Sequence, residues 1–121
     1  MIDKEFKIIT LNNGKKVLTI VFPDKQYALL STFFFVEIGT FEDWIRKNSQ
    51  EVVQGKAEER NISGNICELV IKKMDTTIYD MLAEDGRGVW CSVPTQELLS
   101  MIDEWHERRA TLDDISDYGI L

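Results

Sequence analysis

Only a few side chains in this sequence could support catalysis, and the first of them are two cysteines and one histidine. Cys67 or Cys91 could act as a thiol nucleophile with His106 as its base. Both cysteines stand in segments where apolar and polar residues alternate, which predicts that they are small core residues instead. We expect His106, near the end of a predicted helix, to be solvated or to act as a favourable charge at the helix C-terminus.

The remaining patterns for binding chemistry are incomplete. Asp113, Asp114 and Asp117 are the best cluster for a cation such as Ca²⁺, but they lack the glycine and terminal glutamate of a calcium-binding loop. The segment 86–88 is too short to cradle a phosphate and is more typical of a hairpin tip. Paired carboxylates for glycoside chemistry stay undecided, because the fold sets their separation. We therefore expect no enzyme, no catalytic residue, no cofactor and no metal.

The charge is unevenly distributed along the chain. The 121 residues include 21 acidic and 14 basic ones, which gives a net charge of −7. Residues 1–60 hold nine of each sign, so the whole excess lies in residues 61–121, with twelve acids and five bases. Such a chain would repel a phosphate backbone and attract a basic protein, so we expect no direct contact with nucleic acid. The alternative is that the acidity only keeps the protein soluble.

Length and composition predict a single soluble domain over residues 1–121. Hydrophobic residues make up 44% and charged residues 29%, which is ordinary for a globular protein with a buried core. No apolar run approaches the ~20 residues of a membrane-spanning helix, and no signal-peptide stretch follows the first residues. We expect a cytoplasmic protein without a membrane contact, in which residues 110–121 form a mobile tail or a short helical turn.

Hydrophobic periodicity predicts the elements of the first half. Strands over 6–11 and 16–22 are expected to form a hairpin around the Asn-Gly pair at 13–14. The apolar segment 29–38 predicts a central strand covered on both faces, with a buried helix as the alternative. A helix is expected to begin at Thr40 as its N-cap. Its predicted apolar side consists of Phe41, Trp44, Ile45 and Val52.

The second half predicts strands over 66–71, 76–82 and 89–93, with an exposed loop or ragged edge strand before them at 56–60. A helix capped by Thr95 follows and runs to about residue 109. Its predicted apolar face consists of Leu98, Leu99, Ile102 and Trp105. Together these elements predict an α+β fold, a mostly antiparallel sheet of five or six strands with packed helices.

Core packing is the expected role of all three tryptophans, at positions 44, 90 and 105. Trp90 differs from the others because it alternates with Val89 and Cys91 along its strand. If Val89 and Cys91 face the core, Trp90 lies under a helix or is exposed. Tryptophan is also enriched at interface hot spots, so Trp90 is a candidate contact residue.

Several segments of the chain have a sequence pattern that is known from other proteins. The turn Gly64-Asn65 leads into a strand over 66–71, and a short strand runs directly into the segment Thr-x-Glu-Leu-Leu-x-x-Ile-x-x-Trp at 95–105. The Phe-rich segment that ends at Gly39 fits the same style. These residues resemble the small acidic immunity proteins of bacterial contact-dependent growth inhibition and related polymorphic toxin systems.

The resemblance implies an inhibitor that binds the C-terminal domain of a cognate toxin. Many such toxins are nucleases, which are basic because they hold phosphates. The implied mechanism is occlusion of the toxin's active site, with acidic side chains in place of substrate phosphates. Charge would speed association, and a buried aromatic or aliphatic anchor would slow dissociation.

The acidic C-terminal half is the expected binding surface. Its candidate residues are Trp90 and the acids of the hairpin, the last helix and the tail: Asp80, Glu84, Asp85, Trp90, Asp103, Glu104, Glu107, Asp113, Asp114 and Asp117. One alternative is that each acid is simply a solvated side chain. Two other functions stay open: an adaptor domain without a toxin partner, and a small-molecule or enzymatic domain whose pocket would be lined by Phe33, Phe34, Phe35 and Trp90.

Overall fold

Six strands form two separate antiparallel sheets in the computed structural model, which describes residues 2–84 and 88–112. β1 (Glu5–Thr10) and β2 (Lys16–Val21) pair only with each other. The second sheet contains four strands in chain order: β3 (Glu59–Ser63), β4 (Cys67–Lys72), β5 (Asp75–Asp80) and β6 (Trp90–Pro94). The predicted α+β class is confirmed, but the single sheet of five or six strands is wrong.

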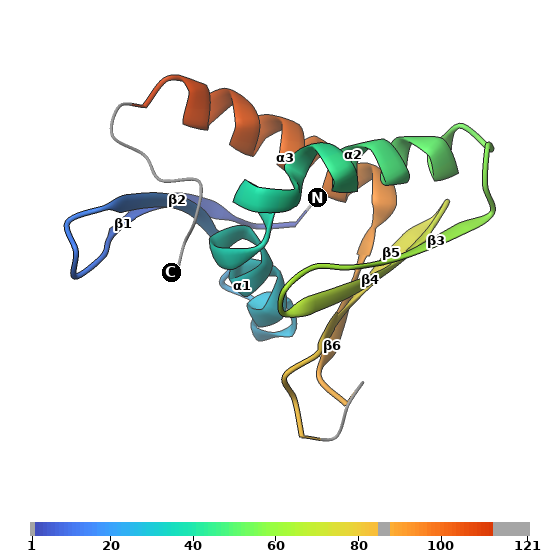
Figure 1. Cartoon of the computed structure of the whole chain (residues 1–121), viewed down its shortest axis with the longest axis horizontal. Helices are drawn as coiled ribbons and strands as arrows, with labels where there is room; N and C mark the ends of the chain where they lie inside the picture. Colours follow the sequence, from blue (N-terminus) through green and yellow to red (C-terminus); the bar gives the residue numbers. More distant parts are fainter. Residues whose placement is uncertain (1, 85–87, 113–121) are drawn as a thin grey trace.

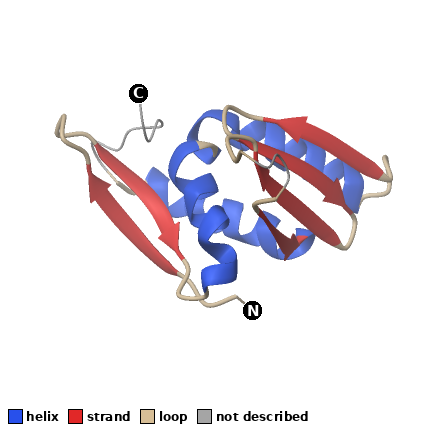
Figure 2. Cartoon of the chain, turned by 90° about the horizontal axis from the view of Figure 1, so that it is seen from below, coloured by secondary structure: helices blue, strands red, loops and turns tan. Residues whose placement is uncertain are grey.

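Three helices lie between the two sheets: α1 (Ala28–Val36), α2 (Ile38–Val53) and α3 (Thr95–Ala110). α2 contacts β3 and β4, while α3 contacts β5 and β6, so together they cover one face of the four-stranded sheet. The β1–β2 hairpin packs against α1 and α3 from the other side, as Figure 2 shows. Figure 1 shows α2 and α3 side by side, with the connection between β5 and β6 far below them.

The N-terminal hairpin confirms the prediction from the Asn-Gly pair. Gly14 has a φ of +83°, the left-handed conformation that the turn requires, and its N–H donates to Leu11 O at 2.9 Å. Asn13 Oδ1 accepts a hydrogen bond from Lys15 N–H at 2.9 Å. The turn therefore fixes the register of β1 and β2.

The apolar segment 29–38 is not a strand, and the helix that was its alternative is what forms. α1 buries Leu30, Phe33 and Phe34 completely, and its other large apolar residues are half-buried, so it is apolar on nearly every side. Asp24 caps the preceding 3₁₀ turn η1 (Lys25–Tyr27) by accepting from Gln26 N–H at 3.0 Å. Because this segment is not part of a sheet, no strand within the described residues connects the N-terminal hairpin to the other four strands.

α2 begins at Ile38, two residues before the predicted N-cap. Thr40 is inside the helix, and its N–H donates to the carbonyl of Glu37 at 3.3 Å. The buried residues of α2 are Ile38, Ile45, Ser49 and Val52, which form one stripe along the helix. Trp44 lies just outside this stripe and is 43% exposed, so its predicted core position is wrong.

Glu37 lies between α1 and α2, and its side chain is hydrogen-bonded to the turn between β3 and β4. Its side chain is 2% exposed and lies away from bulk water. One carboxylate oxygen accepts from Asn65 N–H at 3.1 Å, and the other accepts from Ile66 N–H. Gly64 makes this approach possible, because a Cβ there would overlap the Glu37 carboxylate. The buried charge is thus hydrogen-bonded on both oxygens.

The strands and the helix predicted for the second half are confirmed, although Thr95 has another role. Its hydroxyl donates to Lys72 O and lies 2.9 Å from Thr76 Oγ1, and it makes no hydrogen bond to the first turn of α3. Trp105 is buried as predicted, and its Nε1–H donates to Leu18 O at 3.0 Å. α3 is therefore fixed to both sheets by hydrogen bonds.

Replacement of Glu37 by alanine should lower the free energy of unfolding by about 2–4 kcal/mol, because two buried backbone donors lose their acceptor. Glu58→Ala is the matched control, since Glu58 is an exposed carboxylate, and its effect should stay within about 0.5 kcal/mol. Urea unfolding followed by tryptophan fluorescence measures both. Equal stability of the two variants would contradict this role of Glu37.

Candidate partner-binding surface

The structure places the predicted contact residues in two separate groups. Asp80, Glu84 and Trp90 lie at the free end of the β5–β6 pair, whereas Asp103, Glu104 and Glu107 lie on α3. Figure 1 shows these two regions on opposite sides of the chain. The remaining candidates lie outside the described residues: Asp85, Asp113, Asp114 and Asp117.

Two of the three candidate acids on α3 form ion pairs with nearby bases. Arg46 of α2 donates from Nε to Asp103 Oδ1 at 3.0 Å. Glu104 lies 3.6 Å from Lys4 Nζ and 3.5 Å from Arg108 Nη2. These contacts reduce the local negative charge that α3 offers to a partner.

Exposed apolar side chains gather at the end of the β5–β6 pair. Leu82 is 71% exposed and Trp90 is 57% exposed, and Met81 and Val89 beside them are also exposed. Of the residues that were considered as core positions in this strand, Cys91 is buried but Val89 is exposed, because the helices do not reach this end of the sheet. Together with two acids these residues form the hairpin-end patch, defined as Asp80, Met81, Leu82, Glu84, Val89 and Trp90. Apolar patches with a polar rim are typical of protein interaction sites.

The backbone holds this patch in place. Asp80 N–H donates to Val89 O at 2.9 Å, and Asp80 Oδ1 accepts from Leu82 N–H at 2.9 Å. Met81 N–H donates to Ile66 O at 2.8 Å, which ties the patch to the start of β4. The patch is therefore fixed by hydrogen bonds on either side of the connection.

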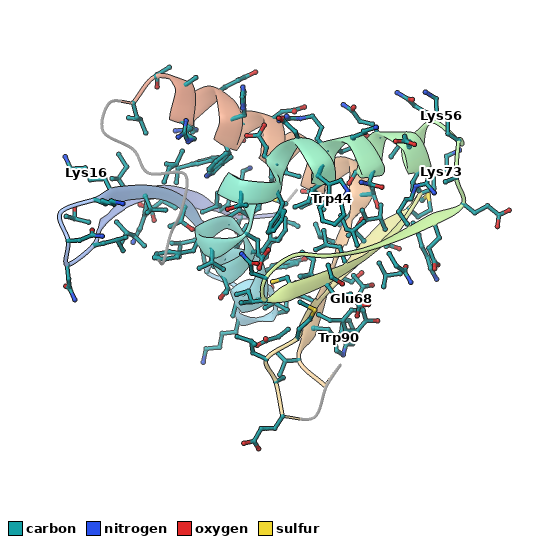
Figure 3. All side chains as sticks on the ribbon, in the orientation of Figure 1. Lys16, Trp44, Lys56, Glu68, Lys73 and Trp90 are labelled. Carbon is teal, nitrogen blue, oxygen red and sulfur yellow. The ribbon has the colours of Figure 1, made fainter. Side chains whose placement is uncertain are left out.

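On the outer face of the four-stranded sheet, residues of β5 and β4 lie beside Trp90. Trp90 pairs with Tyr79 on β5, and Tyr79 pairs with Glu68 on β4. Figure 3 shows Glu68 and Trp90 on the same part of the sheet, whereas Trp44 lies at α2. The alternation of β6 predicted that Trp90 faces away from Cys91, and this is confirmed. Its expected role in core packing is wrong, because Trp90 is exposed. Met81 and Leu82 were missed, because their exposure depends on where the helices end.

The thiols are poor nucleophiles in this fold. Cys67 and Cys91 are buried, as predicted. Burial raises the pKa of the Cys67 thiol to about 12 and that of Cys91 to about 11. His106 is exposed, and its Nδ1 lies 3.0 Å from Glu42 Oε1, so it pairs with a carboxylate of α2. The structure therefore does not support a thiol mechanism, because the cysteines stay protonated and His106 pairs with Glu42 instead of a thiol.

The aromatic pocket considered from the sequence does not form. Phe33 and Phe34 are fully buried and pack edge to face with ring centroids 5.2 Å apart, so they fill the core. Phe35 lines a different depression of about 300 Å³ between β2 and α1. Trp90 is exposed on the outer face of the sheet, so it does not join these buried rings.

No three His, Cys, Asp or Glu side chains within 2–84 and 88–112 form a group that could hold a metal ion. In the same part of the chain, no helix has the length and apolar character needed to cross a membrane.

Similarity to a known protein identifies the family. A Bacillus cereus protein named immunity protein is 38% identical over 104 residues, which cover 86% of this chain and 85% of the relative. The chain belongs to this immunity protein family. No family model and no solved structure matches it. The resemblance seen in the sequence to immunity proteins is thereby confirmed.

The thiols of this immunity protein should react slowly while it is folded. At pH 8 we expect modification by a disulfide reagent to be about a hundredfold slower, or more, than in denaturant, because the folded thiols stay protonated and buried. Absorbance of the released thiol measures both rates. Rapid modification of a fully folded sample would show that at least one thiol is accessible.

Proposed function

We propose that this immunity protein binds and neutralises the C-terminal domain of a cognate toxin, as in contact-dependent growth inhibition and related polymorphic toxin systems. The family supports an inhibitor rather than an enzyme. The net charge of −7 favours a basic partner, and a nuclease is basic because it holds phosphates. The proposed target is therefore a nuclease whose active site is blocked in the cytoplasm, where its substrate would be reached.

The observation that carries the choice of surface is the exposure of Trp90 beside other apolar side chains. A tryptophan that is 57% exposed in a strand is well placed to fill a pocket of a partner and exclude water. Asp80 and Glu84 belong to the same end of the β5–β6 pair, and their carboxylates would stand where a nuclease expects phosphates. The hairpin-end patch therefore combines an apolar anchor with negative charge.

The primary test is growth rescue. The C-terminal domain of the toxin encoded beside this chain is expressed in a sensitive cell, with and without the immunity protein. Arrest that the protein relieves, with degraded RNA or DNA in the arrested cells, supports the proposal. Arrest without nucleic acid damage contradicts the nuclease, and arrest that the protein leaves unchanged favours the adaptor alternative.

Trp90→Ala should weaken binding to the toxin domain by about thirtyfold or more, because truncation of a buried interface tryptophan removes about 2 kcal/mol. Trp44→Ala is the matched control: Trp44 is 43% exposed but lies at α2, away from the patch. Isothermal titration calorimetry measures both dissociation constants. A larger loss with the Trp44 variant would place the interface on α2 instead.

Charge reversal at Glu84 should slow association several-fold at low salt and reduce its dependence on ionic strength. Glu107→Lys is the control, because Glu107 is also an exposed acid but lies on α3. Stopped-flow mixing with the toxin domain over a range of salt concentrations gives both rates. Equal effects of the two reversals would mean that only the net charge matters.

A further inference from the structure

β6 is an edge strand, and its hydrogen bonds to β5 follow a fixed alternation. Asp80 N–H donates to Val89 O at 2.9 Å at one end of the pair. At the other end, Thr95 N–H donates to Met74 O at 3.0 Å. In an antiparallel pair only every second residue bonds to the neighbouring strand, so residues 89, 91, 93 and 95 face β5.

The intervening residues direct their backbone groups to the open side. Trp90 and Ser92 each present an N–H and a C=O there, and Pro94 presents a C=O alone. All three residues are exposed. Among the described residues, β5 is the only strand that pairs with β6. Two donors and three acceptors therefore face the open side.

The two edges of the sheet are protected to different degrees. On the β3 edge, Glu59 lies 3.7 Å from Lys72 Nζ, and Arg60 Nη2 lies 3.3 Å from Glu51 Oε2. Charged side chains of this kind discourage the addition of another strand. β6, with the sequence WCSVP, has no charged residue, and only Pro94 at its end limits pairing.

The charges around β6 favour a basic strand over a second copy of this chain. β5 and β6 contain Asp75 and Asp80 and no basic residue. Glu84 and Glu97 lie just beyond them, and the described base nearest in sequence, Lys73, lies at the turn before Asp75. A second copy would bring the same carboxylates against these. A basic domain would bring opposite charge to them.

We propose that the open edge of β6 receives an extended segment of the toxin as an added strand. This inference rests on the proposed function, since it names how the same partner is held. The added strand would accept from Trp90 and Ser92 N–H groups and donate to their carbonyls. It would end at Pro94, and the Trp90 ring on the adjacent face would contact its side chains.

Proline substitution tests the edge with a control on the opposite side of the sheet. Ser92→Pro removes an outward N–H and leaves every hydrogen bond to β5 in place. Asn61→Pro is the matched control: Gly64 N–H donates to Cys67 O at 2.9 Å, so by the same alternation Asn61 directs its N–H away from β4. Ser92→Ala keeps the N–H and tests the side chain alone.

We expect Ser92→Pro to raise the dissociation constant for the toxin domain about tenfold or more, while Asn61→Pro and Ser92→Ala stay within about threefold. Wild-type affinity of a folded Ser92→Pro variant would overturn the added strand but leave the proposed function intact. Failure of the wild-type protein to bind would instead overturn the proposed function.

Hydrogen exchange of the wild-type protein keeps the test decisive if Ser92→Pro does not fold. In the free protein the Trp90 and Ser92 amides should exchange quickly, and those of Cys91 and Val93 slowly. A saturating amount of toxin domain should protect the first two. Unchanged exchange at Trp90 and Ser92 in the complex would overturn the inference. Protection of these amides in the free protein at high concentration, without toxin, would also overturn it, because it would mean that two copies pair with each other.

Discussion

A buried carboxylate is the interaction on which the arrangement of helices and sheet depends. Glu37 stands between α1 and α2 and accepts hydrogen bonds from the turn between β3 and β4. A charge in this position is tolerable only because both of its oxygens are satisfied and Gly64 leaves room for it. The contact ties α2 to the sheet it covers and lets α1 turn towards the N-terminal hairpin. The negative charge of Glu37 also adds to the effect of burial on the pKa of Cys67.

Much of the second half could be predicted because alternation and helical spacing are visible there. Cys67, Leu69 and Ile71 face inward on β4 at every second position, as the sequence indicated. The segment 29–38 has no such period, since apolar residues fall on every side, and only packing decides between strand and helix. Asp24 was the available signal, because an aspartate before a helical turn is a typical N-cap.

The exposure of the candidate surface was predictable only in part. Alternation along β6 correctly turned Trp90 away from the core. The exposure of Leu82 and Val89 could not be predicted, because it depends on where helices from other parts of the chain end. The acids of α3 looked equally available in the sequence. One of them binds Arg46, which is 57 residues away along the chain and reaches it only through the packing of α2 on α3.

An open edge beside an exposed tryptophan would normally be a liability, because a second copy could pair with it. The acids that flank β6 reduce this risk, since self-pairing would bring like charges together. Pro94 at the end of β6 also shortens the segment that could pair. On the proposed function, the same carboxylates attract the basic partner. In that case the charge would determine which partner binds and how fast it associates. The Trp90 anchor and the backbone hydrogen bonds of the added strand would determine the lifetime of the complex. On this proposal, the same acidic surface would favour binding of the toxin and disfavour self-association.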